Sequence, residues 1–180
     1  MNFDNSNGLA ASRAVDPTND VRLATARKRL AESRDKADAI EGLREIVANL
    51  LGSEEIGLFS IDQTTGAFQV CWSFGADLEN YDLTRALGQA GLQRVMRGEC
   101  QIDVSRKREQ AITEARAFIP IRVEKQTIAI IAILRLLPQK LDFDAADMEL
   151  FKLLSDEAAK PIFCLSGHSK PNSNGTGIKA

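Results

Sequence analysis

Residues 127–136, with the sequence TIAIIAILRL, decide the fold. Successive side chains of a strand point to opposite faces of a sheet. Here both sets are apolar: one set is Ile128, Ile130, Ala132 and Leu134, and the other is Ala129, Ile131 and Ile133. A strand that is apolar on both faces is covered on both. The stretch therefore predicts a central strand in a sheet that lies between two layers.

The neighbouring segments predict two hairpins. Residues 117–123 form a strand that turns into residues 127–136 at Glu124-Lys125-Gln126. Residues 56–61 and 67–74 form the other hairpin. Along its second strand apolar residues alternate with polar ones, which predicts one strongly apolar face. The members of this face are Phe68, Val70, Trp72 and Phe74.

The segment before the first hairpin predicts a long helix. Apolar residues recur at steps of three and four from residue 20 to residue 51, so the helix would reach about 45 Å unless it breaks near residues 33–36. Its first half has many charges around a thin apolar stripe. The stripe suits either a solvated amphipathic helix or a coiled-coil seam with a second copy. Because residues 147–165 also carry an apolar stripe, we expect a homodimer built from both helices.

A closing helix and an irregular middle complete the pattern. Residues 142–166 predict the closing helix, with Asp144 as its N-cap and Pro161 as a kink or early end. Residues 77–98 predict two helical pieces joined through Gly88 and a second glycine. The sequence thus predicts a helix at the end of the fold and irregular structure over one face of the sheet.

Composition and charge limit the domain organisation. The 180 residues are 44% hydrophobic, which suits one domain with flanking segments. We expect a disordered segment at 1–17, a helical extension at 18–36 that could form the dimer seam, the main domain at 37–165 and a disordered tail at 166–180. The net charge of −2 provides no positive field for nucleic acid or an anionic membrane.

Cysteine and histidine usage narrow the chemistry. Cys71, Cys100 and Cys164 are widely spaced, which argues against a disulfide framework and fits a reducing compartment. The single histidine, His168, lies in the tail and argues against a histidine-based metal or catalytic site in the fold. With no signal peptide or membrane span predicted, we expect a cytoplasmic protein.

Several stretches in this order resemble the GAF domain family over residues 37–163. Residues 56–62 with Trp72-Ser-Phe-Gly75 are similar to its opening hairpin and strand-ending glycine. Residues 88–98 with Ile102-Asp103 resemble its short helix over the pocket and the aspartate that follows, and Phe118-Ile-Pro-Ile-Arg122 resembles its apolar-Pro-apolar strand. The resemblance implies an α+β fold: a central antiparallel sheet sandwiched between a terminal-helix bundle and an irregular helical lid.

Part of a nucleotide-binding motif is also present. Nucleotide-binding GAF domains carry Asn-Lys…Phe…Asp-Glu before the last helix. Lys140, Phe143 and Asp147 match it, whereas Gln139 replaces the Asn and Met148 the final Glu. Two roles remain: a Lys140 to Asp147 contact that fastens the helix start, or a cyclic-nucleotide role. We favour the structural role because such pairs commonly serve fold geometry.

Other activities of the family conflict with the residues present. Bilin-binding members use a cysteine followed by histidine, and haem-binding members need a histidine within the domain. We therefore expect no haem, bilin or metal. The GAF-fold enzyme that reduces free methionine sulfoxide is the catalytic alternative, but its cysteines lie together around the pocket. Cys164, on the closing helix, is expected to lie far from the other two, so we predict no catalytic residue and no enzyme.

The resemblance places a ligand pocket between the sheet and residues 77–98. The residues expected to face it are Trp72, Phe74, Tyr81, Arg94 and Phe118. A structural role is open for each, since aromatic residues on strands are commonly core, Tyr81 could lie at the surface and Arg94 on a solvated face.

Two functional classes follow. In the first, the pocket binds a small neutral or anionic molecule and the terminal helices pass the change to an unidentified signalling partner. In the second, side chains fill the pocket and the domain is a dimerising or docking scaffold. A hollow or filled space between sheet and lid would discriminate them.

Overall fold

A computed structural model describes residues 17–102 and 115–164. In these residues five strands form one antiparallel sheet in the order β2-β1-β5-β4-β3. The strands are β1 (Ser53–Ile61), β2 (Phe68–Phe74), β3 (Gln101–Ile102), β4 (Ala117–Val123) and β5 (Gln126–Leu136). The predicted terminal disorder, apart from Pro17, falls outside the described residues, as do Asp103 and His168.

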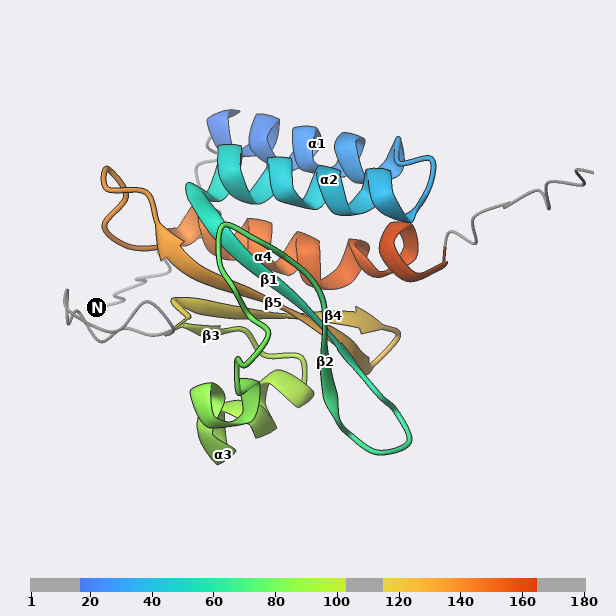
Figure 1. Ribbon diagram of the computed structural model, residues 1–180. Helices are drawn as coiled ribbons and strands as arrows, with labels where there is room; N and C mark the ends of the chain where they lie inside the picture. Colours follow the sequence, from blue (N-terminus) through green and yellow to red (C-terminus); the bar gives the residue numbers. More distant parts are fainter. Residues whose placement is uncertain (1–16, 103–114, 165–180) are drawn as a thin grey trace, which may run out of the picture.

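Helices cover both faces of the sheet (Figure 1). One face is covered by α1 (Pro17–Ala31), α2 (Lys36–Ile46), α4 (Ala145–Glu157) and two π-helical turns, η1 (Val47–Leu51) and η2 (Lys160–Cys164). The other face is covered by α3 (Leu83–Met96). The predicted α+β sandwich is confirmed. In the described part of the chain no helix is both long and apolar enough to cross a membrane.

The central position of β5 is confirmed. This strand pairs with β1 on one side and with β4 on the other. Residues 129–133 have no exposed surface, because helices lie over one face of the strand and α3 lies over the opposite face. The apolar stretch 127–136 therefore packs against the terminal helices on one face and against α3 on the other.

The long amino-terminal helix is broken at residues 32–35. Asp35 has an extended backbone, with φ −152°, and its carboxylate accepts a hydrogen bond from the Asp38 N–H at 2.9 Å. This N-cap begins a new helix, α2, and α1 packs back against α2 and α4. The chain thus forms a helical hairpin and not a single helix of about 45 Å.

The closing helix begins as predicted. The Asp144 carboxylate accepts from the Asp147 N–H, and the Asp147 carboxylate accepts from the Asp144 N–H, which makes a reciprocal capping box. The α-helix ends at Glu157, and residues 160–164 with Pro161 form the π-helical turn η2. It is therefore shorter than the predicted 142–166.

The prediction of one apolar face on β2 is wrong. Val70 pairs with Phe59 and Trp72 with the preceding residue of β1, so Cys71 is an extra residue that forms a β-bulge. At a bulge the alternation of side chains between the two faces of the sheet shifts by one residue. Phe68 consequently packs on the α3 side of the sheet, whereas Trp72 packs on the α2 side.

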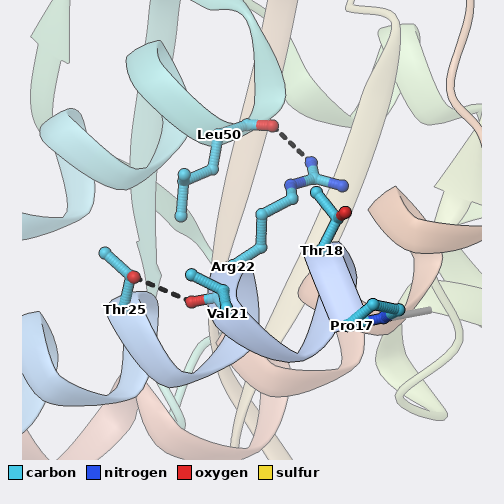
Figure 2. Close-up of a pocket in the computed structure, with 6 residues that line it drawn as sticks. All are labelled: Pro17, Thr18, Val21, Arg22, Thr25 and Leu50. Carbon is cyan, nitrogen blue, oxygen red and sulfur yellow. Dashed lines mark hydrogen bonds between the residues drawn. The ribbon is translucent and has the colours of Figure 1, made fainter. Parts of the chain in front are cut away.

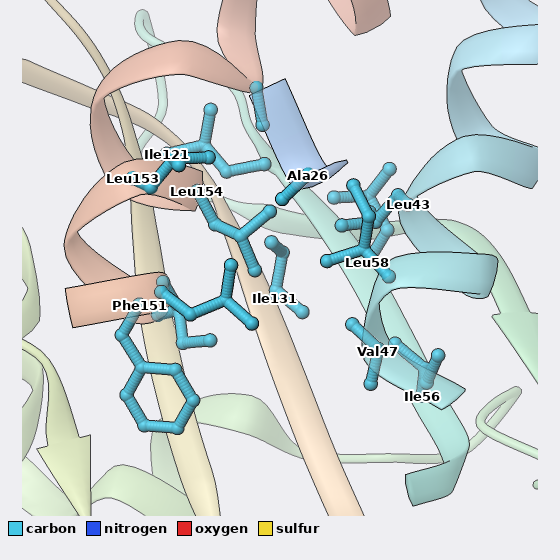
Figure 3. Packing of buried hydrophobic residues seen from close by; sticks show 14 of the residues in the cluster. Ala26, Leu43, Val47, Ile56, Leu58, Ile121, Ile131, Phe151, Leu153 and Leu154 are labelled. Carbon is cyan, nitrogen blue, oxygen red and sulfur yellow. The ribbon is translucent and has the colours of Figure 1, made fainter. Parts of the chain in front are cut away.

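Two clusters of buried apolar side chains lie on opposite faces of the described sheet. The larger, the helix-side core, lies between the sheet and α1, α2 and α4 (Figure 3). The smaller, the lid-side core, lies between the sheet and α3. Ala26 and Leu30 of α1 belong to the helix-side core, so the apolar stripe of this helix contacts α2 and α4 of the same chain.

Candidate functional site

The lid α3 consists of two pieces. Its first piece starts at the N-cap Asp82, whose carboxylate accepts from the Arg85 N–H at 2.9 Å. Gly88, with φ 61° and ψ 169°, then interrupts the helix, in a backbone conformation that is almost restricted to glycine. The predicted division at Gly88 is present. The buried residues of both pieces are Leu83, Leu87, Gly91 and Val95.

Thr127 of β5 fastens the end of the lid. Its hydroxyl, which is buried, donates to the carbonyl of Val95 at 3.0 Å and lies 3.3 Å from that of Met96. The Val95 carbonyl, in the last turn of the helix, also accepts from the Gly98 N–H at 2.9 Å. The contact therefore ties the second piece of α3 to the central strand.

Thr127→Val should loosen this attachment. The substitution keeps the shape of the side chain and removes the donor, and because the Val95 carbonyl keeps its bond from the Gly98 N–H, the loss should be about 0.5 to 1.5 kcal/mol. We expect a lower free energy of unfolding in urea and faster amide exchange in α3 than in α4. Thr127→Ser, which keeps the hydroxyl, is the control. Equal exchange in the two variants would show that the hydroxyl does not hold the lid.

Two of the five predicted pocket residues pack on the lid-side core. Phe118 is 5% exposed and belongs to the lid-side core. Tyr81 packs against the same core, with its ring centroid 5.7 Å from that of Phe59. Phe59 was not predicted as a pocket residue, although it is an aromatic residue in a strand of the expected sheet. Arg94 lies exposed on α3, outside the buried face of that helix.

Trp72 and Phe74 lie elsewhere. Their rings stack with a centroid distance of 6.3 Å, and the Arg44 guanidinium of α2 lies 4.9 Å from the centroid of Phe74. Trp72 packs against the helix-side core, and Phe74 is 39% exposed. The bulge at Cys71 is the reason, because it changes the face to which these side chains point. The five predicted residues therefore do not form one pocket.

Asp147 is the centre of a buried charge cluster. Its side chain has no exposed surface and lies at the start of α4. It accepts hydrogen bonds from Lys140 at 2.8 Å, from Arg22 at 2.7 Å and from the Asp144 N–H at 2.9 Å. Both carboxylate oxygens thus have donors, which come from α1 and from the loop before α4. Phe143 packs edge to face on Phe151, with centroids 5.0 Å apart, beside this cluster.

The charge cluster keeps Asp147 ionised. Burial alone would raise the pKa of Asp147, but the hydrogen bonds from Lys140, Arg22 and the Asp144 N–H outweigh it, so the pKa lies below its usual value. The Lys140–Asp147 pair could be predicted from the sequence, because the two residues are only seven positions apart. The sequence gives no local signal for Arg22, which is 125 residues from Asp147.

Shallow depressions lie on both sides of α1. One, of about 450 Å³, is lined mainly by the first turns of α1 and by Leu50, and there Arg22 also donates to the Leu50 carbonyl (Figure 2). The other, of about 410 Å³, lies between the end of α1 and η2, and its lining includes Leu30, Ser33 and Pro161. Both are open surface features.

The cysteines do not share a site. Cys71 lies on β2 and Cys100 directly before β3, and these are the two outer strands, so about four strand spacings, or roughly 19 Å, separate them. Cys164 ends η2 on the helical face. Burial, with a smaller effect of Asp156, raises the pKa of Cys100 to about 11, which keeps its thiol protonated. Among the described residues no three His, Cys, Asp or Glu side chains form a metal-binding group.

Comparison with known proteins identifies the fold. No family model matches the sequence, and no curated protein is similar to it. The GAF domain of a phosphoenolpyruvate-protein phosphotransferase from Acinetobacter is similar with a TM-score of 0.59 and 17% identity, over 82% of this chain and 94% of that one. The GAF domain of the potassium sensor histidine kinase KdpD from Escherichia coli has a TM-score of 0.54 and 13% identity, over 81% and 94%.

An enzyme is also among the similar structures. The type II free methionine-R-sulfoxide reductase from Thermoplasma acidophilum has a TM-score of 0.51 and 14% identity, over 80% of this chain and 96% of that one. The sheet covered by terminal helices on one face and by a lid on the other defines an α+β domain. More specifically, the chain has the GAF-domain fold.

Proposed function

We propose that this chain is a non-enzymatic regulatory module of the GAF type. In this proposal a small molecule binds under α3, and the terminal helices pass the change to a second copy and to a signalling partner. The observation that carries it is the central strand. Ile130 and Ala132 of β5 belong to the lid-side core, whereas Ile131 and Ile133 belong to the helix-side core. A shift of this strand therefore reaches both layers.

The lid supports a role in binding. It is divided at Gly88 and covers the smaller of the two cores, so its pieces can move separately more easily than a continuous helix. The surroundings of Tyr81 and Phe118 are apolar, which suits a small aromatic or aliphatic molecule. Because Arg94 is exposed, a neutral molecule is favoured over an anionic one.

The proposal that the chain is not a reductase rests on the cysteines, and the proposal that it does not bind a nucleotide rests on Asp147. Cys71 and Cys100 lie at opposite edges of the sheet, which does not suit a reductase that needs them together. Both Asp147 oxygens are already bonded within the chain, which supports a structural role over nucleotide binding. The similar domain in a potassium sensor histidine kinase supports a signalling role.

A ligand-free scaffold is the second candidate function. Phe59, Leu83, Leu87 and Phe118 are all buried in the lid-side core, so side chains occupy much of the space beneath the described lid. In such a protein the lid would be a fixed cover, and the helices alone would serve docking or dimerisation.

A thermal-shift screen separates these functions. Nucleotides, amino acids, oxoacids and nitrogen oxyanions would be added to the full chain, and a sensor should show at least one stabiliser, since stability rises as RT ln(1 + [L]/Kd). Tyr81→Phe should reduce the shift given by a hydrogen-bonding compound. Trp72→Phe, on the opposite face, should leave it unchanged. A screen without a stabiliser, or equal effects of the two variants, would favour the scaffold.

A further inference from the structure

Polar and charged side chains hold α1 against α4. Three contacts are spread along the helix, and all of them pair a donor of α1 with an acidic residue of α4. They are Asn19 to Glu149 at 2.6 Å, Arg22 to Asp147 at 2.7 Å and Arg27 to Glu157 at 2.9 Å. The edge of α4 that faces α1 is therefore acidic.

Helix α1 is held against α2 in the same way. Arg29 donates to Glu45 at 2.6 Å and to Asp38 at 3.0 Å. Its guanidinium also lies over Gly42, where a Cβ would come within 3.0 Å of it. Helix α1 is thus a basic helix in a groove with two acidic edges, formed by α2 and α4, which we call the α2–α4 groove.

Apolar contact contributes little to this docking. Of the fifteen residues of α1, all described, Ala26 and Leu30 are buried, and Leu23 is partly buried. The surface depressions on both sides of the helix show that its flanks are not closely packed. Among the ion pairs of α1, Arg27–Glu157 is exposed and therefore weak, whereas Arg22–Asp147 is largely buried. Helix α1 is therefore held by few apolar side chains and by a small set of polar pairs.

The buried carboxylate tolerates the departure of α1. Asp147 has two cationic partners, Arg22 on α1 and Lys140 on the loop before α4. If α1 leaves, Lys140 still forms an ion pair with the carboxylate, and the Asp144 N–H still donates to it. The severe cost of an unpaired buried charge is thereby avoided.

The connection between α1 and α2 can become helical. Residues 32–35, Glu-Ser-Arg-Asp, contain neither glycine nor proline, and the apolar repeat continues on both sides of them. The break is held by the Asp35 N-cap. With that cap opened, α1, residues 32–35 and α2 form one continuous helix, which carries α1 away from its own groove.

We propose that α1 and α2 open into this continuous helix and that α1 of each chain docks into the α2–α4 groove of a second copy. Every contact of α1 is then made again between chains, because helix and groove are identical in both copies. The basic helix and the acidic groove edges identify this occupant. The inference deepens the dimer part of the proposed function and does not depend on a ligand under α3.

A proline at the start of α2 tests the exchange. Lys36 is the first residue of α2, a position that accepts proline, and Asp35 has the extended backbone that proline requires of its predecessor. Lys36→Pro keeps the hairpin and disrupts a continuous helix, so it should weaken the dimer by about a hundredfold. Lys36→Ala removes the same side chain without this effect and should dimerise like the wild type. Asp35→Ala, without the cap, should strengthen the dimer.

Sedimentation over a range of concentrations measures these effects. A dimer that Lys36→Pro weakens and Lys36→Ala does not supports the exchange. If Lys36→Pro and the wild type dimerise equally, the exchange is overturned, while the proposed dimer survives through another surface. A wild type that stays monomeric throughout overturns the exchange and removes the dimer from the proposed function.

Cross-linking of a variant with one conservative substitution tests directly whether α1 docks on the second copy. Arg27→Lys places an amine beside Glu157, and a zero-length carbodiimide can join them. Chains of ordinary and heavy nitrogen would be mixed in denaturant, refolded together and cross-linked as dimers. Cross-linked peptide pairs with one light and one heavy partner show that α1 docks on the second copy. Pairs with both partners light or both heavy, and none mixed, overturn the proposal.

Discussion

Gly75→Ala should lower the free energy of unfolding by about 4 kcal/mol or more, a loss found for few single substitutions. Gly75 directly follows β2 with φ +73°, and a Cβ there would lie 2.1 Å from the carbonyl oxygen of Glu54. That oxygen belongs to the backbone of β1, so it cannot move away as the end of a flexible side chain could. Urea unfolding followed by circular dichroism measures the loss.

Gly66→Ala is the matched control. Gly66 has nearly the same backbone angle, φ +71°, but no atom lies within 4 Å of a Cβ built on it. Its substitution costs the left-handed backbone strain alone, about 1 to 2 kcal/mol. Equal losses at the two glycines would show that the approach of Gly75 to Glu54 is not a tight contact.

Asp147→Ala should have the next largest effect, a loss of about 3 kcal/mol. Removal of one partner from a buried ion pair costs about 3 to 5 kcal/mol, and we take the lower end because Arg22 and Lys140 each keep 20% of their side chains exposed. The capping box of α4 is lost as well. Asp156→Ala, which removes an exposed carboxylate from the same helix, should change the stability by less than about 0.5 kcal/mol.

The lowered pKa of Asp147 predicts that the free energy of unfolding depends on pH. Because the pKa of Asp147 is lowered on folding, its stabilisation is complete above the ordinary value of about 4 and is lost as the pH falls through the folded pKa. Wild-type stability should therefore decline below pH 4 more steeply than that of Asp147→Asn. Parallel declines in urea titrations would show that Asp147 does not contribute this way.

The parts of the fold with a strong local pattern were predictable from sequence. Residues 127–136 are apolar on both faces and form the central strand, and Asp144 caps α4 with Asp147 in the reciprocal position. The break at residues 32–35 was left open, because no proline or glycine marks it and a single cap at Asp35 decides it.

The candidate site was less predictable because it depends on long-range geometry. A one-residue bulge at Cys71 moves Trp72 and Phe74 to the α2 side, and nothing in an alternating strand marks such a bulge. The pairing of Arg22 with Asp147 is set by the docking of α1, which no local pattern reveals.

A crystal structure of the protein purified from its own host tests the central proposal most directly. The proposal predicts density for a small molecule between the sheet and α3, in contact with Phe118 and Tyr81, which both pack on the lid-side core. Contradiction would be a lid in which Phe59, Leu83, Leu87 and Phe118 contact one another across that whole space and leave no room for a bound molecule.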